Sequence, residues 1–324
     1  DLHGFFMDGS SMGKKKKLLT AKQQREIDYY VQAYPEFYRT AEQTIWERLA
    51  QLDAGITPDA LNQTRQYPRF SKLTDAELYI VNFSDFGGDL NLLRDAILRR
   101  FIRAAPLELA LHVSLWTRTY WVFVQINANE KWEELFRPIL QAVCARDFVA
   151  ATKLSELTTP IIARPKNRAY ASVFLGVSGL IRKDPKLLEQ AVEKERKSDP
   201  SYVKAIRGVL RAVADNSAAD FAEQMNKVLS AYRRYMFDDE LYGLFDPHAQ
   251  GLFELSRRYN PEVVSSFDVD RKLPWDREYF EWSQEIDDVS KYFDIDAIPD
   301  RIKPFILDFT PIPWAATVRE NWVQ

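Results

Sequence analysis

The sequence predicts an all-α protein: an irregular array of antiparallel helix hairpins on which a loop-rich C-terminal segment packs. Three observations predict this class. Apolar residues recur at helical spacing, prolines stand directly after capping residues, and alternating strand patterns are scarce. The stretch ADFAEQMNKVLSAYRRYMF illustrates the helical spacing, because one stripe of an amphipathic helix collects Phe221, Met225, Val228, Leu229, Tyr232 and Tyr235.

Four dipeptides mark predicted helix starts: Thr57-Pro58, Asp184-Pro185, Asp199-Pro200 and Asp246-Pro247. An Asp or Thr side chain can accept a hydrogen bond from a free amide of the first turn. Proline loses nothing at the first helical position, because an amide hydrogen there has no partner within the helix. Each dipeptide is therefore expected to open a helix, and closely spaced starts favour helix hairpins.

The most apolar stretch of the chain, Leu107–Ala128, is expected to be a buried helix. Glu108, His112 and Arg118 interrupt the apolar run of about 20 residues that a membrane span needs. The stretch AELYIVNF at 76–83 is compatible with a short strand or with a helical turn. No fixed period of about 34 residues stands out, which favours an irregular array over a regular solenoid.

The predicted domain organisation is simple. Residues 1–17 are expected to be a disordered leader or an expression remnant, with the native start at Met12. Residues 18–324 are expected to form a single helical domain, with a subdivision near residue 160 left open. From about Asn260 onward prolines, aromatics and acids become frequent, which is typical of short helices and loops wrapped on a helical body.

Composition argues against several function classes. The 44 basic and 47 acidic residues give a net charge of -3, so the chain lacks the overall positive charge of many nucleic-acid-binding proteins. Apolar residues make up 46% of the chain, enough for a substantial core. The single cysteine, Cys144, cannot form an intramolecular disulfide, which favours a reducing compartment such as the cytoplasm.

The chain offers little material for catalysis or metal binding. Its histidines, His3, His112 and His248, lie far apart in sequence, and a small apolar position on a helix suits the lone cysteine. A zinc site or a Cys–His nucleophile pair would need more such residues. His248 stands just after the start at Asp246-Pro247, and we interpret it as a packed first-turn residue. No catalytic residue, metal or cofactor is expected.

An acidic stretch rich in aromatics lies between Asp268 and Asp300. It contains eleven carboxylates against four bases, with six aromatics interleaved. Carboxylates can steer a basic partner, and aromatic side chains supply much of the binding energy at protein interfaces. The alternative is that the aromatics belong to the core and the acids to a solvated face. The first interpretation selects these partner-binding residues: Trp282, Glu285, Asp287, Asp288, Tyr292, Asp294 and Asp296.

Four features follow one another in the second half of the chain. They are a helix hairpin (NRAYASVFLGVSGLIRKDPKLLEQAVEKER), a helix ending in basic residues (ADNSAADFAEQMNKVLSAYRR), a helix beginning with Asp-Pro (LFDPHAQGLFELSRRYNPEVV) and a Leu-Pro closing element (DRKLPWDREYF). In this order, from about Asn167 to Trp275, they resemble the immunity protein 49 family of bacterial toxin neighbourhoods. The resemblance implies an all-helical, non-enzymatic protein that binds and neutralises a cognate toxin in the cytoplasm of the producing cell.

The expected function is therefore that of a cytoplasmic immunity protein, with its acidic stretch covering the basic active-site cleft of a protein toxin. One alternative is a helical scaffold or adaptor for another bacterial partner. Another is an enzyme that uses paired carboxylates such as Asp238 and Asp239. Neighbouring residues on a helix point about 100 degrees apart, so this pair cannot converge without help from elsewhere. Neither a membrane nor nucleic acid is expected as a direct partner.

Overall fold

The computed structural model of the chain describes residues 21–33, 43–88, 96–97, 100, 105–127, 132–157, 168–192, 198–235, 244–269 and 273–320. These ranges contain α-helices, short 3-10 helices and no strand, which confirms the predicted all-α class. The predicted leader at 1–17, the subdivision near 160 and the pair Asp238 and Asp239 lie outside the described residues. The predictions about them stay predictions.

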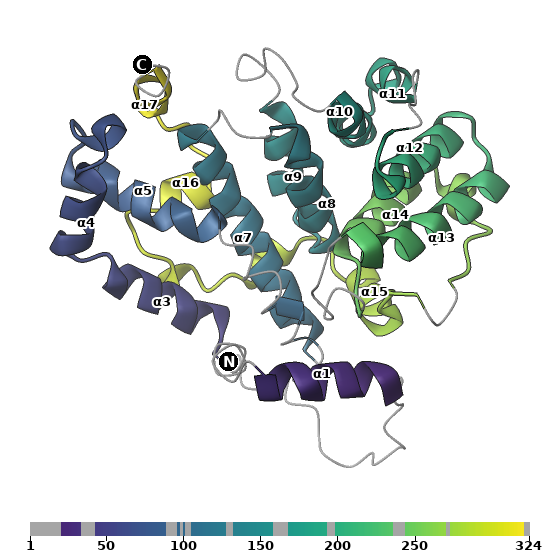
Figure 1. Cartoon of the computed structure of the whole chain (residues 1–324), viewed down its shortest axis with the longest axis horizontal. Helices are drawn as coiled ribbons and strands as arrows, with labels where there is room; N and C mark the ends of the chain where they lie inside the picture. The colour runs from purple at the N-terminus through teal and green to yellow at the C-terminus, as the bar shows by residue number, and fades with distance from the viewer. Residues whose placement is uncertain are drawn as a thin grey trace.

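The long helix α7 (Pro106–Ile126) divides the array in two (Figure 1). On one side lie α3 (Ile45–Gly55), α4 (Pro58–Arg65), η1 (Pro68–Phe70) and α5 (Asp75–Gly88), with α1 (Ala21–Ala33) below. On the other side lie η2 (Trp132–Leu135), α8 (Phe136–Cys144), α9 (Phe148–Glu156), α10 (Arg168–Arg182), α11 (Pro185–Val192), α12 (Ser201–Ala214), α13 (Ala218–Tyr235) and α14 (Pro247–Tyr259). The C-terminal part consists of η4 (Pro261–Val264), α15 (Arg277–Gln284), η5 (Val289–Tyr292), η6 (Ile295–Ala297), α16 (Lys303–Ile306) and α17 (Ala315–Glu320).

The four predicted helix starts are confirmed, with helices beginning at Pro58, Pro185, Ser201 and Pro247. Thr57 and Asp184 accept hydrogen bonds from first-turn amides, as does Asp246, and a proline follows each of them. At Asp199-Pro200 the helix start is confirmed, but not the cap. Helix α12 begins at Ser201 with Pro200 as its flanking residue, and the Asp199 carboxylate instead pairs with the buried guanidinium of Arg207 at 3.2 Å. An ion pair with the next turns of the helix therefore replaces the cap at this position.

The stretch 76–83, which is compatible with a strand or a helix by its pattern, is part of helix α5. A reciprocal capping box starts this helix, since Glu77 accepts from the Thr74 amide and Thr74 accepts from the Glu77 amide. The predicted buried helix at 107–128 is confirmed as α7, and nearly all of its side chains are buried. Within the described residues, no helix is long and apolar enough to cross a bilayer.

Three helix hairpins, α8–α9, α10–α11 and α12–α13, share one kind of turn. One or two positions after the first helix a residue has a left-handed backbone, and the next residue caps the second helix. The amide of the capping residue also bonds back to the first helix, as in the 2.8 Å bond from Asp147 to the Ala142 carbonyl. The turn pairs are Arg146-Asp147, Lys183-Asp184 and Asn216-Ser217. Such short turns make the two helices of each hairpin neighbours.

Helix α14 is a core element of this array. It packs against α8, α10 and α13, and its residues from Pro247 to Ser256 are buried. It crosses α8 at Gly251, where an added Cβ would lie 2.7 Å from the carbonyl carbon of Leu140 and closer still to its oxygen. A side chain of any size would therefore push the two backbones apart.

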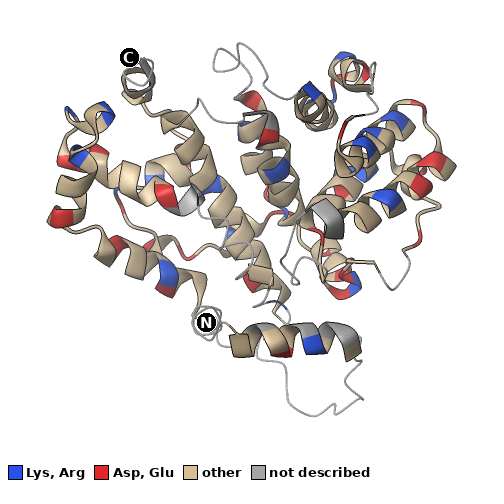
Figure 2. Cartoon of the chain, in the orientation of Figure 1, with Lys and Arg blue, Asp and Glu red and all other residues tan. Residues whose placement is uncertain are grey.

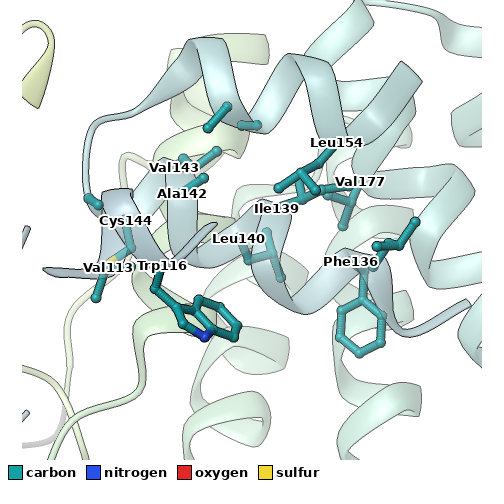
Figure 3. Close-up of a cluster of buried hydrophobic side chains, with 14 of the residues drawn as sticks. Val113, Trp116, Phe136, Ile139, Leu140, Ala142, Val143, Cys144, Leu154 and Val177 are labelled. Atoms are coloured by element: carbon teal, nitrogen blue, oxygen red, sulfur yellow. The ribbon is translucent and has the colours of Figure 1, made fainter. Parts of the chain in front are cut away.

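Helix α8 lies at the centre of the hydrophobic core. Figure 3 shows Ile139, Leu140 and Val143 of this helix among Trp116 of α7 and Val177 of α10. All five side chains are at most 4% exposed. The core thus joins the central helix to the hairpins, and it supplies the rigid body on which the C-terminal part lies.

The C-terminal part packs on α7, as predicted for a loop-rich segment. A buried arginine helps to hold it there: Arg118 of α7 donates from Nη1 to the Ile306 carbonyl at 2.8 Å, and it binds Asp147 through Nε at 2.6 Å and Nη2 at 3.1 Å. Ser114 donates to the same carboxylate. One arginine therefore connects the central helix, the α8–α9 turn and the C-terminal part.

Candidate protein-binding surface

The candidate site is the acidic segment, which we define as residues 285–296. Glu285, Asp287, Asp294 and Asp296 are exposed. Two apolar side chains stand among them, with Tyr292 48% and Ile295 54% exposed; they are two of the five exposed large apolar side chains in the described part of the chain. In Figure 2 acidic positions mark the loop that passes between α3 and α7. The predicted carboxylates and an accessible aromatic thus share one short surface segment.

Buried residues anchor the acidic segment from within. Val289 is fully buried and Phe293 is 9% exposed, and the following Ile298 is 1% exposed. The Phe293 ring meets Trp46 of α3 edge-on, with 6.2 Å between centroids, and the Arg118 guanidinium lies 5.0 Å from the same ring. The exposed side chains therefore project from a backbone that is fixed between two helices.

Some of the predicted binding residues have local structural roles. Asp288 accepts a hydrogen bond from the Ser290 amide and Asp294 from the Ala297 amide, so each caps a 3-10 turn. Trp282 is half-buried, with its ring 5.5 Å from that of Tyr279. Its accessible area is therefore smaller than that of Tyr292. Glu285, Asp287, Tyr292 and Asp296 are the predicted residues that are exposed and cap no 3-10 turn.

An arginine cluster that sequence analysis did not identify borders the acidic segment. Arg146 donates from Nε to the Ile286 carbonyl at 2.7 Å and from Nη1 to Glu254 at 2.5 Å. Its own carbonyl accepts from the Val289 amide. Glu254 also binds two arginines of α14, Arg257 and Arg258. In the sequence, only the adjacent Arg257 and Arg258 near the end of α14 indicated this cluster.

A second polar cluster is buried around His248. Its Nε2 lies 2.9 Å from the side-chain nitrogen of Gln141, and its Nδ1 lies 3.2 Å from the Tyr202 hydroxyl. Asp246 caps the helix through the His248 and Ala249 amides, and its carboxylate lies 3.7 Å from Nδ1. The side chain of His248 is 1% exposed. This agrees with its interpretation as a packed first-turn residue.

Burial keeps both groups of this cluster neutral. Desolvation raises the pKa of Asp246 to about 8, against two backbone hydrogen bonds that lower it. Desolvation, with a smaller contribution from the charge of Arg137, lowers the pKa of His248 to about 3. In the folded state the proton of the pair therefore resides on Asp246, whereas in the unfolded chain at pH 5 it resides on His248.

This exchange predicts an unusual pH dependence. Between about pH 4 and 6.5 the folded and unfolded pair each hold one proton, so the pair contributes no slope to stability. Asp246→Asn keeps a capping residue, but His248 is then the only group of the pair that can bind a proton. His248 binds this proton in the unfolded chain and not in the folded protein. We expect this variant to lose about 1.4 kcal/mol of unfolding free energy per pH unit, relative to wild type, as pH falls below about 6.5. Urea unfolding between pH 6.5 and 4.5 measures this.

Asp184→Asn is the matched control, because it makes the same exchange at the accessible cap of α11. Its unfolding free energy is expected to follow the wild-type pH profile. Parallel profiles for wild type and Asp246→Asn would contradict the assigned proton positions. In the wild type, the pair should also make stability fall as pH rises from about 6.5 to 8, since only the folded state keeps the proton there.

The other residues considered for catalysis or metal binding are buried or do not form a cluster. Burial raises the pKa of the Cys144 thiol far above its usual value, so the reactive thiolate is suppressed. The part of the chain that the structure describes holds no group of three or more His, Cys, Asp or Glu side chains suited to a metal ion. Protein-family models, curated proteins and solved structures give no match to the chain. The acidic segment is thus the most developed candidate for binding.

Proposed function

We propose that this protein binds and neutralises a bacterial toxin in the cytoplasm of the producing cell. In this proposal the acidic segment covers a basic surface at the toxin's active site. Two exposed apolar side chains, Tyr292 and Ile295, lie in the same segment as exposed carboxylates. This observation carries the binding part of the proposal. The resemblance of residues 167–275 to immunity proteins supports the identity of the partner.

Charge supports a basic partner. The acidic segment holds five carboxylates and one lysine, a net charge of -4, whereas the whole chain carries only -3. Opposite charge on the partner accelerates association, and a desolvated aromatic at the centre of an interface slows dissociation. Because buried anchors hold the segment in place, binding loses little conformational entropy. Occlusion of an active site by this surface requires no catalytic group.

The test removes charge without removing caps. Glu285→Gln, Asp287→Asn and Asp296→Asn are combined, since none of these side chains caps a 3-10 turn. We expect the association rate with the partner at low salt to fall about tenfold or more, and its dependence on salt to weaken. Stopped-flow or surface-based kinetics at two ionic strengths measures both. The matched control neutralises Glu156, Glu189 and Glu223, exposed acids on other helices.

The partner itself is sought by capture from the native host with the wild-type protein and both triple variants. We expect one basic polypeptide that the wild type and the control retain and the charge-reduced variant loses. This polypeptide should arrest growth when expressed alone, and co-expression of the wild-type protein should restore growth. A captured partner that is not toxic would favour the adaptor function. If the wild type and both triple variants associated equally fast with the partner, the acidic segment would not be part of the interface.

A further inference from the structure

The arginine cluster beside the acidic segment carries more positive charge than its one carboxylate balances. Glu254 binds Arg146 at 2.5 Å, Arg257 at 2.8 Å and Arg258 at 3.3 Å. Three guanidinium groups against one carboxylate leave a charge of +2. No second carboxylate pairs with Arg257 or Arg258 in the described parts of the chain. The excess charge is therefore available at the surface.

The two arginines of α14 have donors that Glu254 does not use. Arg257 donates hydrogen bonds to Glu254 from Nε and Nη2, so its Nη1 remains available as a donor. Arg258 donates to Glu254 only from Nε, so both of its terminal nitrogens remain available. Their side chains are 39% and 44% exposed. Adjacent guanidinium edges of this kind match the oxygens of a carboxylate or phosphate and bind them with charge-assisted hydrogen bonds.

The donors are also held in place before any ligand binds. The Arg258 guanidinium lies 3.3 Å from the centre of the Phe148 ring, and Arg146 lies 5.2 Å from the same ring. Partial burial, and after it the charge of Arg146, keeps the pKa of Arg258 below its usual value. An anion that reaches this site would relieve the repulsion among the three arginines without ordering flexible side chains.

We propose that Arg257 and Arg258 form an oxyanion-binding site, supported from below by Glu254 and Phe148, that takes a phosphate or carboxylate group. The site borders the acidic segment, because Arg146 binds both Glu254 and the Ile286 carbonyl. The molecule thus presents neighbouring surfaces of opposite charge. This inference does not depend on the proposed function, since the site can be tested on the chain alone.

The test titrates the full chain with sodium phosphate and, separately, with sodium acetate at constant ionic strength. The backbone amide signals of Phe148 and Arg258 in NMR spectra report binding. We expect saturating shifts with a Kd on the order of 1 mM for the better anion. The double variant Arg257→Gln/Arg258→Gln should weaken this affinity about tenfold or more. Saturation by phosphate alone identifies a phosphate site, and saturation by acetate as well identifies a general oxyanion site.

Arg182→Gln is the matched control, because Arg182 is likewise an exposed arginine in the last turn of a helix. This variant should bind both anions as the wild type does. Linear shifts without saturation, or equal losses in the control and the double variant, would overturn the proposal, because they indicate nonspecific ionic effects. A failure of this test would leave the kinetics of the acidic segment untouched, so the two proposals fail separately.

Discussion

Replacing Gly251 by alanine is expected to lower the free energy of unfolding by about 3 kcal/mol or more. The new Cβ would meet the backbone of Leu140 on α8, at 2.7 Å from its carbonyl carbon. Backbone atoms of a helix cannot move aside as a flexible side chain can, so α14 and α8 must separate. Separation would open the core around His248 and Leu252. Chemical denaturation of the purified variant measures the loss.

Gly55→Ala is the control for this prediction. An added Cβ at Gly55, the last residue of α3, would meet nothing within 4 Å. Because alanine has the lower conformational entropy when unfolded, we expect this variant to be as stable as the wild type or up to about 1 kcal/mol more stable. If Gly251→Ala unfolded at the same denaturant concentration as Gly55→Ala, the close approach of α8 and α14 would be wrong.

Replacing Asp147 by alanine is expected to cost about 3–5 kcal/mol of unfolding free energy. The change leaves Arg118 buried without its carboxylate, and it removes the cap of α9 at the Ala150 amide. Because Arg118 also holds the Ile306 carbonyl, amides of α16 should exchange their hydrogens faster in this variant. Denaturation and hydrogen exchange together check both effects.

One further variant separates the effect of the Asp147 charge from that of the Asp147 cap, and a second is a control for exposed ion pairs. Asp147→Asn retains a good capping residue, so most of the loss should persist if the missing charge causes it. Glu223→Ala breaks an exposed pair with Lys227 and should change stability by no more than about 0.5 kcal/mol. A loss restricted to Asp147→Ala would assign the effect to the cap and contradict the importance of the buried ion pair.

Local rules predicted much of the helical framework. Thr57 and Asp246 start helices as expected, because a cap involves only residues that are three positions apart or closer. A helix also begins after Asp199-Pro200, but there the Asp199 carboxylate pairs with Arg207 of the same helix. The capping box of Thr74 and Glu77 was readable in the sequence and would have identified α5 as a helix.

The candidate surface was predicted only in part. The density of acids between 268 and 300 indicated an accessible segment, and Glu285 and Asp287 are indeed exposed. The sequence does not distinguish Tyr292, which faces solvent, from its neighbour Phe293, which packs on Trp46. That choice depends on helix α3, which lies more than two hundred positions earlier in the chain.

The sequence by itself determined the all-α class, the central buried helix and most helix starts, because periodicity and capping act between residues a few positions apart. Only the tertiary structure decided which charges meet. Arg146, Glu254 and Ile286 come together through the α8–α9 turn, helix α14 and the C-terminal part. Contacts between such distant residues depend on how the helices pack, and no local pattern records them. The arginine cluster and the exposure of the acidic segment are therefore properties of the fold.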